Sequence, residues 1–370
     1  MNSILAKYAR LLVHYCLEIQ EDDKLFVSST TLAEPLIREV YRAAVQAGAN
    51  VEVELTFREQ GRIFLEEAKE AQLRYIPSLY KKAMEEFDAY LYIRAPFNLR
   101  EERNVDAGKA NIRKEATKGV LKTYFERTAT RDLKRSLCQF PTLAAAQEAG
   151  MSLEEYEHFV FGACHLFAKD PTQKWLDVRK SQQQMVDFLN RRTEVRYFGE
   201  GIDISFSTQG RVWMNSDGQT NMPSGEVYTS PVEDSVNGTI HFSYPAVYMG
   251  HEVEEVTLWV KDGYVEKWEA KRGGEFLDRV FDIPGARRFG EAAIGTNYNI
   301  DRFTKNILFD EKIGGTVHMA IGQSYLQTGG QNQSSIHWDM IAEMQNGGVI
   351  FADDEKIYED GKFLFVKDGK

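Results

Sequence analysis

The spacing of apolar residues divides the chain into two stretches of different character. In the first stretch, short runs with the alternation of a β-strand are separated by longer runs with helical spacing. The predicted strands are 24–28, 51–57 and 89–93, and the predicted helices are 31–47 and 58–85, the latter broken near Pro77. Strands that alternate with helices are typical of βαβ units, so we predict a mainly parallel sheet covered by helices.

Helical spacing dominates between residues 100 and 190, and the pattern changes near Arg192. Ser152 and Glu155 form a capping-box pattern at the start of one helix, and a second helix is predicted over 174–189. Short alternating runs follow at 194–198, 203–207, 238–244, 254–261 and 264–270. We therefore predict an N-terminal α/β domain at 1–191 and a β-rich α+β domain at 192–370.

Composition and charge narrow the possible partners. The 370-residue chain has 43% hydrophobic residues and a net charge of −11. This acidity argues against binding to nucleic acid or to an anionic membrane, both of which select basic surfaces. Residues 1–20 have the spacing of an amphipathic docking helix with no signal-peptide features, and no run of eighteen apolar residues predicts a membrane span. We therefore expect a cytoplasmic protein.

Several familiar catalytic patterns are absent or fail on inspection. The chain lacks GxGxxG after a strand, GxxxxGK[ST] and GxSxG. His251-Glu252 resembles the start of HExxH, but position 255 is Glu and the segment alternates like a strand. The pair Cys164-His165 lies in a predicted helix, where adjacent side chains do not face each other. The three cysteines are scattered and lack CxxC spacing, so we expect neither disulfides nor a thiolate metal site.

Oxygen and imidazole donors gather instead in four segments of the last third of the chain. Glu226 follows a Pro-Ser-Gly turn, and Glu291 lies among small apolar residues, where an unpaired charge would be costly. His318 lies in an apolar run. His337 and Asp339 point to the same side of a strand, because side chains alternate with period two. These donors predict a metal site in the β-rich domain.

The balance of donors favours more than one ion. Ligands that are all nitrogen and oxygen suit zinc, cobalt, manganese or iron. Three or four carboxylates carry more negative charge than one divalent ion requires, so two ions sharing a bridging carboxylate fit better.

Four ordered motifs resemble those of the M29 metallopeptidases, the family of aminopeptidases T and S. They are PSGEV, GEAAIG, DEKIGGTVHMAIG with Tyr325 beyond it, and SSIHWDM. The resemblance extends over essentially the whole chain. It implies a metal-dependent aminopeptidase that uses two divalent ions (Zn, Co, Mn or Mg), removes residues from peptides with a free N-terminus and forms a homodimer.

The resemblance also implies roles for individual residues. Glu226, Glu291 and His318 would hold one ion, and His337 and Asp339 the other, with Glu291 bridging. Tyr325 matches an active-site Tyr that ligates or donates to the developing oxyanion. Glu311 matches an acidic position that serves as second-metal ligand or general base. Its distance from His318 along the chain is longer than the family's usual spacing, which leaves the choice between these two roles open.

Two alternatives remain from the residues themselves. His318, His337 and Asp339 could form the 2-His-1-carboxylate triad of an iron-dependent ring-cleaving dioxygenase, although Glu226 and Glu291 would then have no role. The chain could also be a non-catalytic binding protein that contains a structural ion.

Overall fold

The computed structural model describes residues 2–366. The chain forms two compact units, of which unit 1 comprises Met1–Thr172 and Gly218–Pro223, and unit 2 comprises Gln173–Asp217 and Ser224–Lys370. The domains predicted from sequence divide the chain at 191/192, after the long helix α9 (Pro171–Leu189), whereas the contacts divide it near the start of that helix. Hydrogen bonds from Gln182 to Asn215 and Ser216 explain why α9 groups with unit 2.

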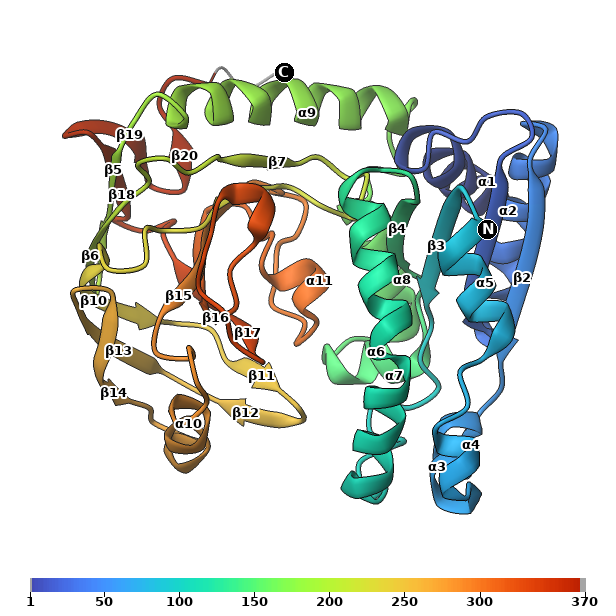
Figure 1. Ribbon diagram of the computed structural model, residues 1–370. Helices are drawn as coiled ribbons and strands as arrows, with labels where there is room; N and C mark the ends of the chain where they lie inside the picture. The colour runs from blue at the N-terminus through green and yellow to red at the C-terminus, as the bar shows by residue number, and fades with distance from the viewer. Residues whose placement is uncertain (1, 367–370) are drawn as a thin grey trace. The chain divides into compact units, whose positions relative to one another are not determined.

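Unit 1 is built on the parallel sheet that the alternating pattern predicts (Figure 1). Its strand order is β2-β1-β3-β4-β8, and each neighbouring pair is parallel. The strands are β1 (Lys24–Thr30), β2 (Asn50–Thr56), β3 (Ala89–Arg94), β4 (Lys134–Gln139) and β8 (Asn221–Met222). The helical elements are α1 (Asn2–Arg10), η1 (Leu11–Cys16), η2 (Thr31–Ala33), α2 (Glu34–Gln46), α3 (Gln60–Glu67), α4 (Glu70–Leu73), α5 (Ser78–Glu86), α6 (Ala107–Ala129), α7 (Leu143–Glu148) and α8 (Leu153–Ala163).

Most of the elements predicted for unit 1 are present, and one strand was missed. The sequence KRSLCQ of β4 falls inside the stretch predicted to be mostly helical. Its polar side chains hide the alternation, and pairing with β3 on one side and β8 on the other supplies the hydrogen bonds that make it a strand. The capping box at the start of α8 is confirmed, because Ser152 and Glu155 each accept the other's backbone N–H.

The N-terminal helix docks on the core of unit 1, as its apolar spacing predicts. Tyr8, Leu11 and Leu12 are almost completely buried. The hydroxyl of Tyr8 donates toward the carbonyl oxygen of Gln139 at 3.3 Å. A helix this short is barely stable by itself in water, so most of its stability comes from packing this apolar face against the core.

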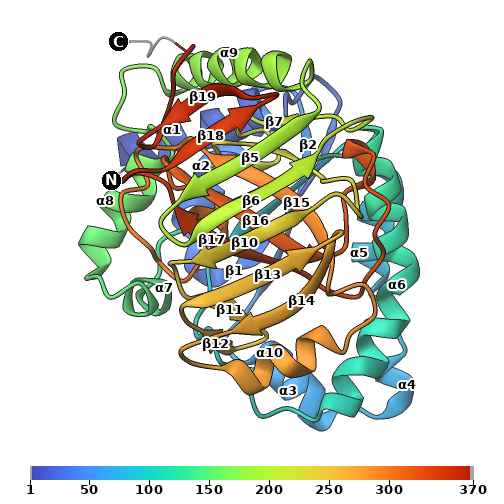
Figure 2. The ribbon, with the colours of Figure 1, turned by 90° about the vertical axis from the view of Figure 1, so that its left-hand side faces the viewer.

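Unit 2 is β-rich, as predicted, and its strands are mainly antiparallel (Figure 2). One sheet has the order β14-β13-β10-β6-β5-β18-β19-β20, a second has the order β17-β16-β15-β9-β7, and β11 pairs with β12. The strands are β5 (Glu194–Gly199), β6 (Ile202–Ser207), β7 (Met214–Ser216), β9 (Glu226–Thr229), β10 (Asn237–Phe242), β11 (Ala246–Tyr248), β12 (His251–Val253), β13 (Val256–Lys261), β14 (Tyr264–Glu269), β15 (Phe289–Gly295), β16 (Thr316–Gly322), β17 (His337–Glu343), β18 (Val349–Ala352), β19 (Glu355–Glu359) and β20 (Lys362–Phe363). The remaining helical elements are α10 (Gly274–Phe281), α11 (Ile307–Asp310) and η3 (Leu326–Thr328).

A single hydrophobic core joins the two large sheets of unit 2. Side chains such as Tyr197 and Phe206 from one sheet pack in the same cluster as Phe289, Met319 and Trp338 from the other. Strands β15 and β16 are buried at every position. Such continuous burial is typical of a strand enclosed on both faces. Any charged side chain on these strands therefore needs a partner inside the protein.

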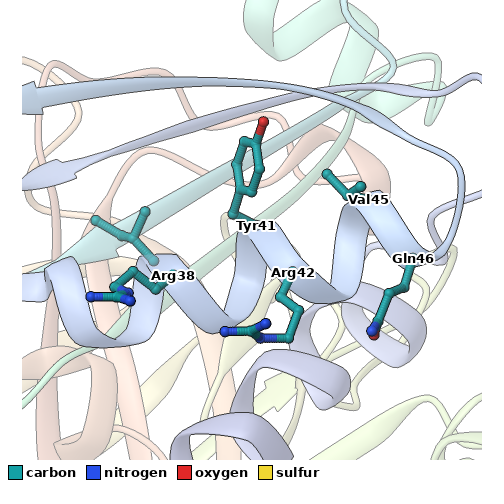
Figure 3. Close-up of a pocket in the computed structure, with 6 residues that line it drawn as sticks. Arg38, Tyr41, Arg42, Val45 and Gln46 are labelled. Atoms are coloured by element: carbon teal, nitrogen blue, oxygen red, sulfur yellow. The ribbon is translucent and has the colours of Figure 1, made fainter.

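None of the helices in residues 2–366 is long and apolar enough to cross a membrane. A shallow depression of about 470 Å³ lies along α2 in unit 1 (Figure 3). Its lining residues are Ile37, Arg38, Tyr41, Arg42, Val45 and Gln46. It contains none of the donor residues predicted from the sequence.

Candidate metal centre

Four neighbouring strands of unit 2 carry the predicted metal ligands on one face. The order of the strands is β17-β16-β15-β9. The register places Glu226 opposite Gly295, His318 opposite Ala293, Asp339 opposite Ala320, and His337 opposite Gly322. Directly opposed residues of antiparallel strands share a face. Each of these donors therefore has glycine or alanine opposite it on one neighbouring strand, although His318 also has Ile341 opposite it on β17. The small residues leave room for long side chains to converge above the sheet.

The converging side chains form two groups that share one carboxylate. Ligand atoms of Glu226, Glu291 and His318 lie within 4.8 Å of one another, as do those of Glu291, His337 and Asp339. We call these groups the first trio and the second trio. The sharing of Glu291 is the arrangement expected of a carboxylate between two ions.

In the first trio, Nε2 of His318 faces two carboxylates. It lies 3.5 Å from Oε2 of Glu226 and 3.6 Å from Oε1 of Glu291. Burial by itself would lower the pKa of His318, but these carboxylates outweigh it and raise that pKa to about 9. Burial would likewise raise the pKa of Glu291, but hydrogen bonding to His318 and His337 holds it below its ordinary value. This part of the sheet therefore favours a positive charge between its side chains.

In the second trio, the orientation of His337 is fixed by the backbone. Its Nδ1 donates to the carbonyl oxygen of Gln323 at 2.7 Å, which directs Nε2 toward Glu291 Oε2 at 3.1 Å and Asp339 Oδ1 at 3.6 Å. A backbone carbonyl that holds the far nitrogen of a histidine is the usual support of a metal-ligating imidazole. Burial would lower the pKa of His337, but the carboxylates raise it to about 12.

The donors have the character required to hold divalent cations. Oδ1 of Asp339, which faces the second trio, is buried without a hydrogen-bond partner in the described part of the chain. Asp339 is also held strongly ionised, because His337 outweighs the effect of burial and lowers its pKa to about 2. Buried carboxylates and imidazoles without enough protein partners fit metal ions, and the set of nitrogen and oxygen donors fits Zn, Co or Mn.

Glu311 lies beside the first trio and outside both groups of metal donors. It directly follows α11, and the preceding Asp310 holds this turn by accepting from the backbone N–H and hydroxyl of Thr304, both at 2.8 Å. Burial raises the pKa of Glu311 to about 8, with an opposing effect from the neighbouring Lys312 and a reinforcing one from Glu226.

Lys312 was missed in the sequence because a lysine after two acidic residues is usually solvated. Here its side chain is completely buried, and its Nζ contacts Oε1 of Glu311 and lies 3.6 Å from Oε1 of Glu226. Burial alone would lower its pKa, but the two carboxylates raise it above the ordinary value, so the ammonium group stays charged. The feature of the sequence that could have pointed to Lys312 is its position directly after Glu311, a predicted site residue.

Tyr325 stands at the open side of the second trio. The residue is 37% exposed, and its ring centroid lies 4.9 Å from that of His337 and 5.5 Å from that of Tyr228. Burial of the hydroxyl, reinforced by the nearby Glu291 and Asp339, raises the pKa of Tyr325 well above its ordinary value. The hydroxyl is therefore protonated at neutral pH and can donate a hydrogen bond.

The turn before Glu226 requires glycine. Gly225 has a φ of 120°, and a Cβ built on it would lie 2.7 Å from the Cβ of Asn297. The backbone of Glu226 is held from the other side, because Nε2 of Gln182 donates to its carbonyl oxygen at 3.1 Å. The start of β9 is thus fixed between α9 and the turn at Asn297.

The residues rejected from the sequence lie in other surroundings. His251 belongs to strand β12 and stacks on Phe276, with ring centroids 4.3 Å apart, which confirms that it does not begin a helical HExxH motif. Cys164 lies in unit 1 directly after α8, which ends at Ala163, so the prediction that the pair Cys164-His165 lies in a helix is wrong. Cys164 is buried beside Tyr8, as expected of a structural thiol.

The geometry also separates the proposed dioxygenase ligands. His318 belongs to the first trio, whereas His337 and Asp339 belong to the second. Among residues 2–366, no group of potential metal ligands contains these three residues together. The mononuclear triad therefore receives no support from the arrangement.

Comparison with known proteins identifies the family. The family model described as thermophilic metalloprotease (M29) matches residues 1–363. Aminopeptidase 2 of Geobacillus stearothermophilus is 28% identical over 98% of both chains. The structure of AmpT from Thermus thermophilus superimposes with a TM-score of 0.85 at 22% identity, covering 98% of this chain and 99% of that one.

A more distant fold similarity concerns the dioxygenase alternative. The structure of 2,5-dihydroxypyridine dioxygenase from Pseudomonas putida has a TM-score of 0.57 at 13% identity and covers 99% of this chain and 98% of that one. At this identity the match shows a shared fold alone. Because the M29 model covers nearly the whole chain, this protein belongs to the M29 metallopeptidase family.

Proposed function

We propose that this M29 enzyme is a metal-dependent aminopeptidase whose centre binds two divalent ions. The observation that carries the proposal is the pair of donor trios joined through Glu291. The resemblance to Aminopeptidase 2 supports the choice of exopeptidase within the family. Its substrates would be peptides with a free N-terminus.

Each trio supplies ligands for one ion. Glu226, Glu291 and His318 would hold the first, and His337 and Asp339, with Glu291 shared, would hold the second. When bound, a pair of divalent ions supplies a water of lowered pKa and an electrophile for the scissile carbonyl. The hydrogen bond from His337 to the carbonyl of Gln323 would keep Nε2 available as a ligand.

Two further side chains would act on the reacting groups. Glu311 would take a proton from the attacking water and pass it to the leaving amine. Burial raises the pKa of Glu311 above that of an ordinary carboxyl group, which makes its carboxylate a stronger base. Tyr325 would donate its hydroxyl proton in a hydrogen bond to the oxyanion that develops on the carbonyl.

The test combines metal analysis with hydrolysis. Purified wild type is assayed on a panel of aminoacyl-anilides and their N-blocked counterparts, with and without chelator, and bound metal is measured on the same samples. We expect hydrolysis of the free-amine substrates alone, its loss on chelation and its return on adding a divalent ion. Glu291→Ala and His318→Ala should abolish hydrolysis and lower the metal content.

The same experiment separates the alternatives. Full activity in either variant would refute the metal centre. A wild type that binds metal but hydrolyses no peptide would favour the binding protein with a structural ion. Iron content together with oxygen consumption on a dihydroxy-aromatic compound would favour the dioxygenase.

The native metal, the cellular location and the assembly belong to the same proposal. We propose Zn, Co, Mn or Mg as the ions, a cytoplasmic location and a homodimer. Metal analysis of protein purified without added metal tests the first. Cell fractionation tests the second, and light scattering at several concentrations tests the third.

A further inference from the structure

The fully buried Lys312 is a charged group that the proposed chemistry does not yet use. Its side chain has no exposed surface. Lysine is rarely buried completely unless it is paired, because removing an ammonium group from water is costly. Its partners are Glu311, which it contacts directly, and Glu226, whose Oε1 lies 3.6 Å from Nζ. The lysine therefore joins one predicted metal ligand to the candidate base.

The backbone delivers this lysine from a fixed position. Its N–H donates to the carbonyl oxygen of Phe309 at 2.9 Å, and its own carbonyl oxygen accepts from the N–H of Asn297 at 3.0 Å. Asn297 in turn donates from its side chain to the carbonyl of Ser224 at 2.8 Å, next to the turn that opens β9. The segments that carry Lys312 and Glu226 are thus tied together through Asn297.

The two oxygens of Glu226 face different partners. Oε1 lies near Nζ of Lys312, whereas Oε2 lies 3.5 Å from Nε2 of His318. A carboxylate divided in this way presents one oxygen to the metal centre. Glu311 has an oxygen against the same ammonium group and does not belong to either trio.

We propose that Lys312 is a positioning residue for the aminopeptidase reaction, turning Oε1 of Glu226 away from the metal centre and holding Glu311 outside it for proton transfer. This inference rests on the proposed function. It assigns Glu311 to proton transfer in place of metal ligation. It also predicts that removing the ammonium group lowers kcat while the metal content per chain stays unchanged.

The experiment compares Lys312→Met, which removes the charge at similar length, with Lys312→Arg, which keeps it. Lys356→Met is the matched control, because Lys356 lies on the surface of the same unit and forms an ion pair with Glu359 at 2.7 Å. For each protein we measure metal per chain after desalting, the rate of metal release to a chelator, the melting temperature, and kcat and KM on an aminoacyl-anilide.

In Lys312→Met we expect kcat to fall by about 10- to 100-fold with little change in KM, as for other residues that orient a metal centre. Metal per chain should equal that of wild type, with slower release to the chelator, because the freed Glu311 can then join the ligands. Lys312→Arg should recover part of kcat, and Lys356→Met should match wild type in every measurement. Wild-type kcat in Lys312→Met, or loss of metal in parallel with loss of kcat, would overturn the proposal.

Glu311→Gln provides a second test that leaves the lysine in place, in case Lys312→Met does not fold. This variant should keep the metal content of wild type and lose most of kcat. Loss of an ion from it would show that Glu311 is a ligand and would overturn the inference alone. A wild type that neither binds metal nor hydrolyses the substrate would instead refute the proposed function, so the two failures are distinguishable.

Discussion

Gly322 at the end of β16 gives the sharpest test of how the second trio is built. Its φ is 96°, and a Cβ at this position would lie less than 3.0 Å from the carbonyl oxygen of Ile336, the residue before His337. In Gly322→Ala, the left-handed backbone costs about 1–2 kcal/mol. The displaced backbone adds about 1–3 kcal/mol. We therefore expect a destabilisation of about 2–5 kcal/mol, and a melting temperature lower by about 2–4 °C for each kcal/mol.

Gly210→Ala is the matched control, because Gly210 has a similar φ of 73° but an added Cβ would meet nothing within 4 Å. Gly210→Ala should lower the free energy of unfolding only by the cost of a left-handed backbone at alanine, about 1–2 kcal/mol. Calorimetry gives the two melting temperatures, and elemental analysis gives metal per chain. We expect Gly322→Ala to lose the ion of the second trio, since Ile336 must move and His337 with it. Equal destabilisation of both variants, or undiminished metal in Gly322→Ala, would refute this reasoning.

Three further predictions concern single side chains. Tyr325→Phe should lower kcat by about 10²- to 10³-fold with unchanged metal content, and a wild-type kcat would remove Tyr325 from the mechanism. His251→Ala should leave metal content and kcat as they are, because His251 stacks on Phe276 outside both trios, so a loss of metal would contradict the site described here. Burial raises the pKa of Cys164 to about 12, and Cys16 and Cys138 are buried as well. Iodoacetamide at pH 8 should therefore label none of the three thiols in the folded protein and all three after denaturation, as measured by mass spectrometry.

The parts of the fold that follow local rules could be predicted closely from the sequence. Strands β1, β2 and β3 and the capping box of Ser152 were recognisable because alternation and capping depend on neighbouring residues. Strand β4 was not recognisable, because only pairing with β3 and β8 makes its polar sequence a strand. The grouping of α9 with unit 2 likewise depends on contacts with Asn215, which lies far along the chain from Gln182.

The sequence alone determined the candidate donors, because an isolated carboxylate or imidazole in an apolar run requires a compensating charge wherever the chain folds. The tertiary structure decided how they group. The register of four antiparallel strands, with glycine or alanine opposite each donor on one neighbouring strand, produces two trios that share Glu291. The tertiary structure also decided the place of Lys312. In the sequence this lysine follows two acidic residues, a pattern typical of the surface, but the turn after α11 places its side chain between Glu226 and Glu311 inside the protein. Spacing along a chain fixes which face of a strand a residue occupies, whereas distances between strands arise only from the pairing of distant segments.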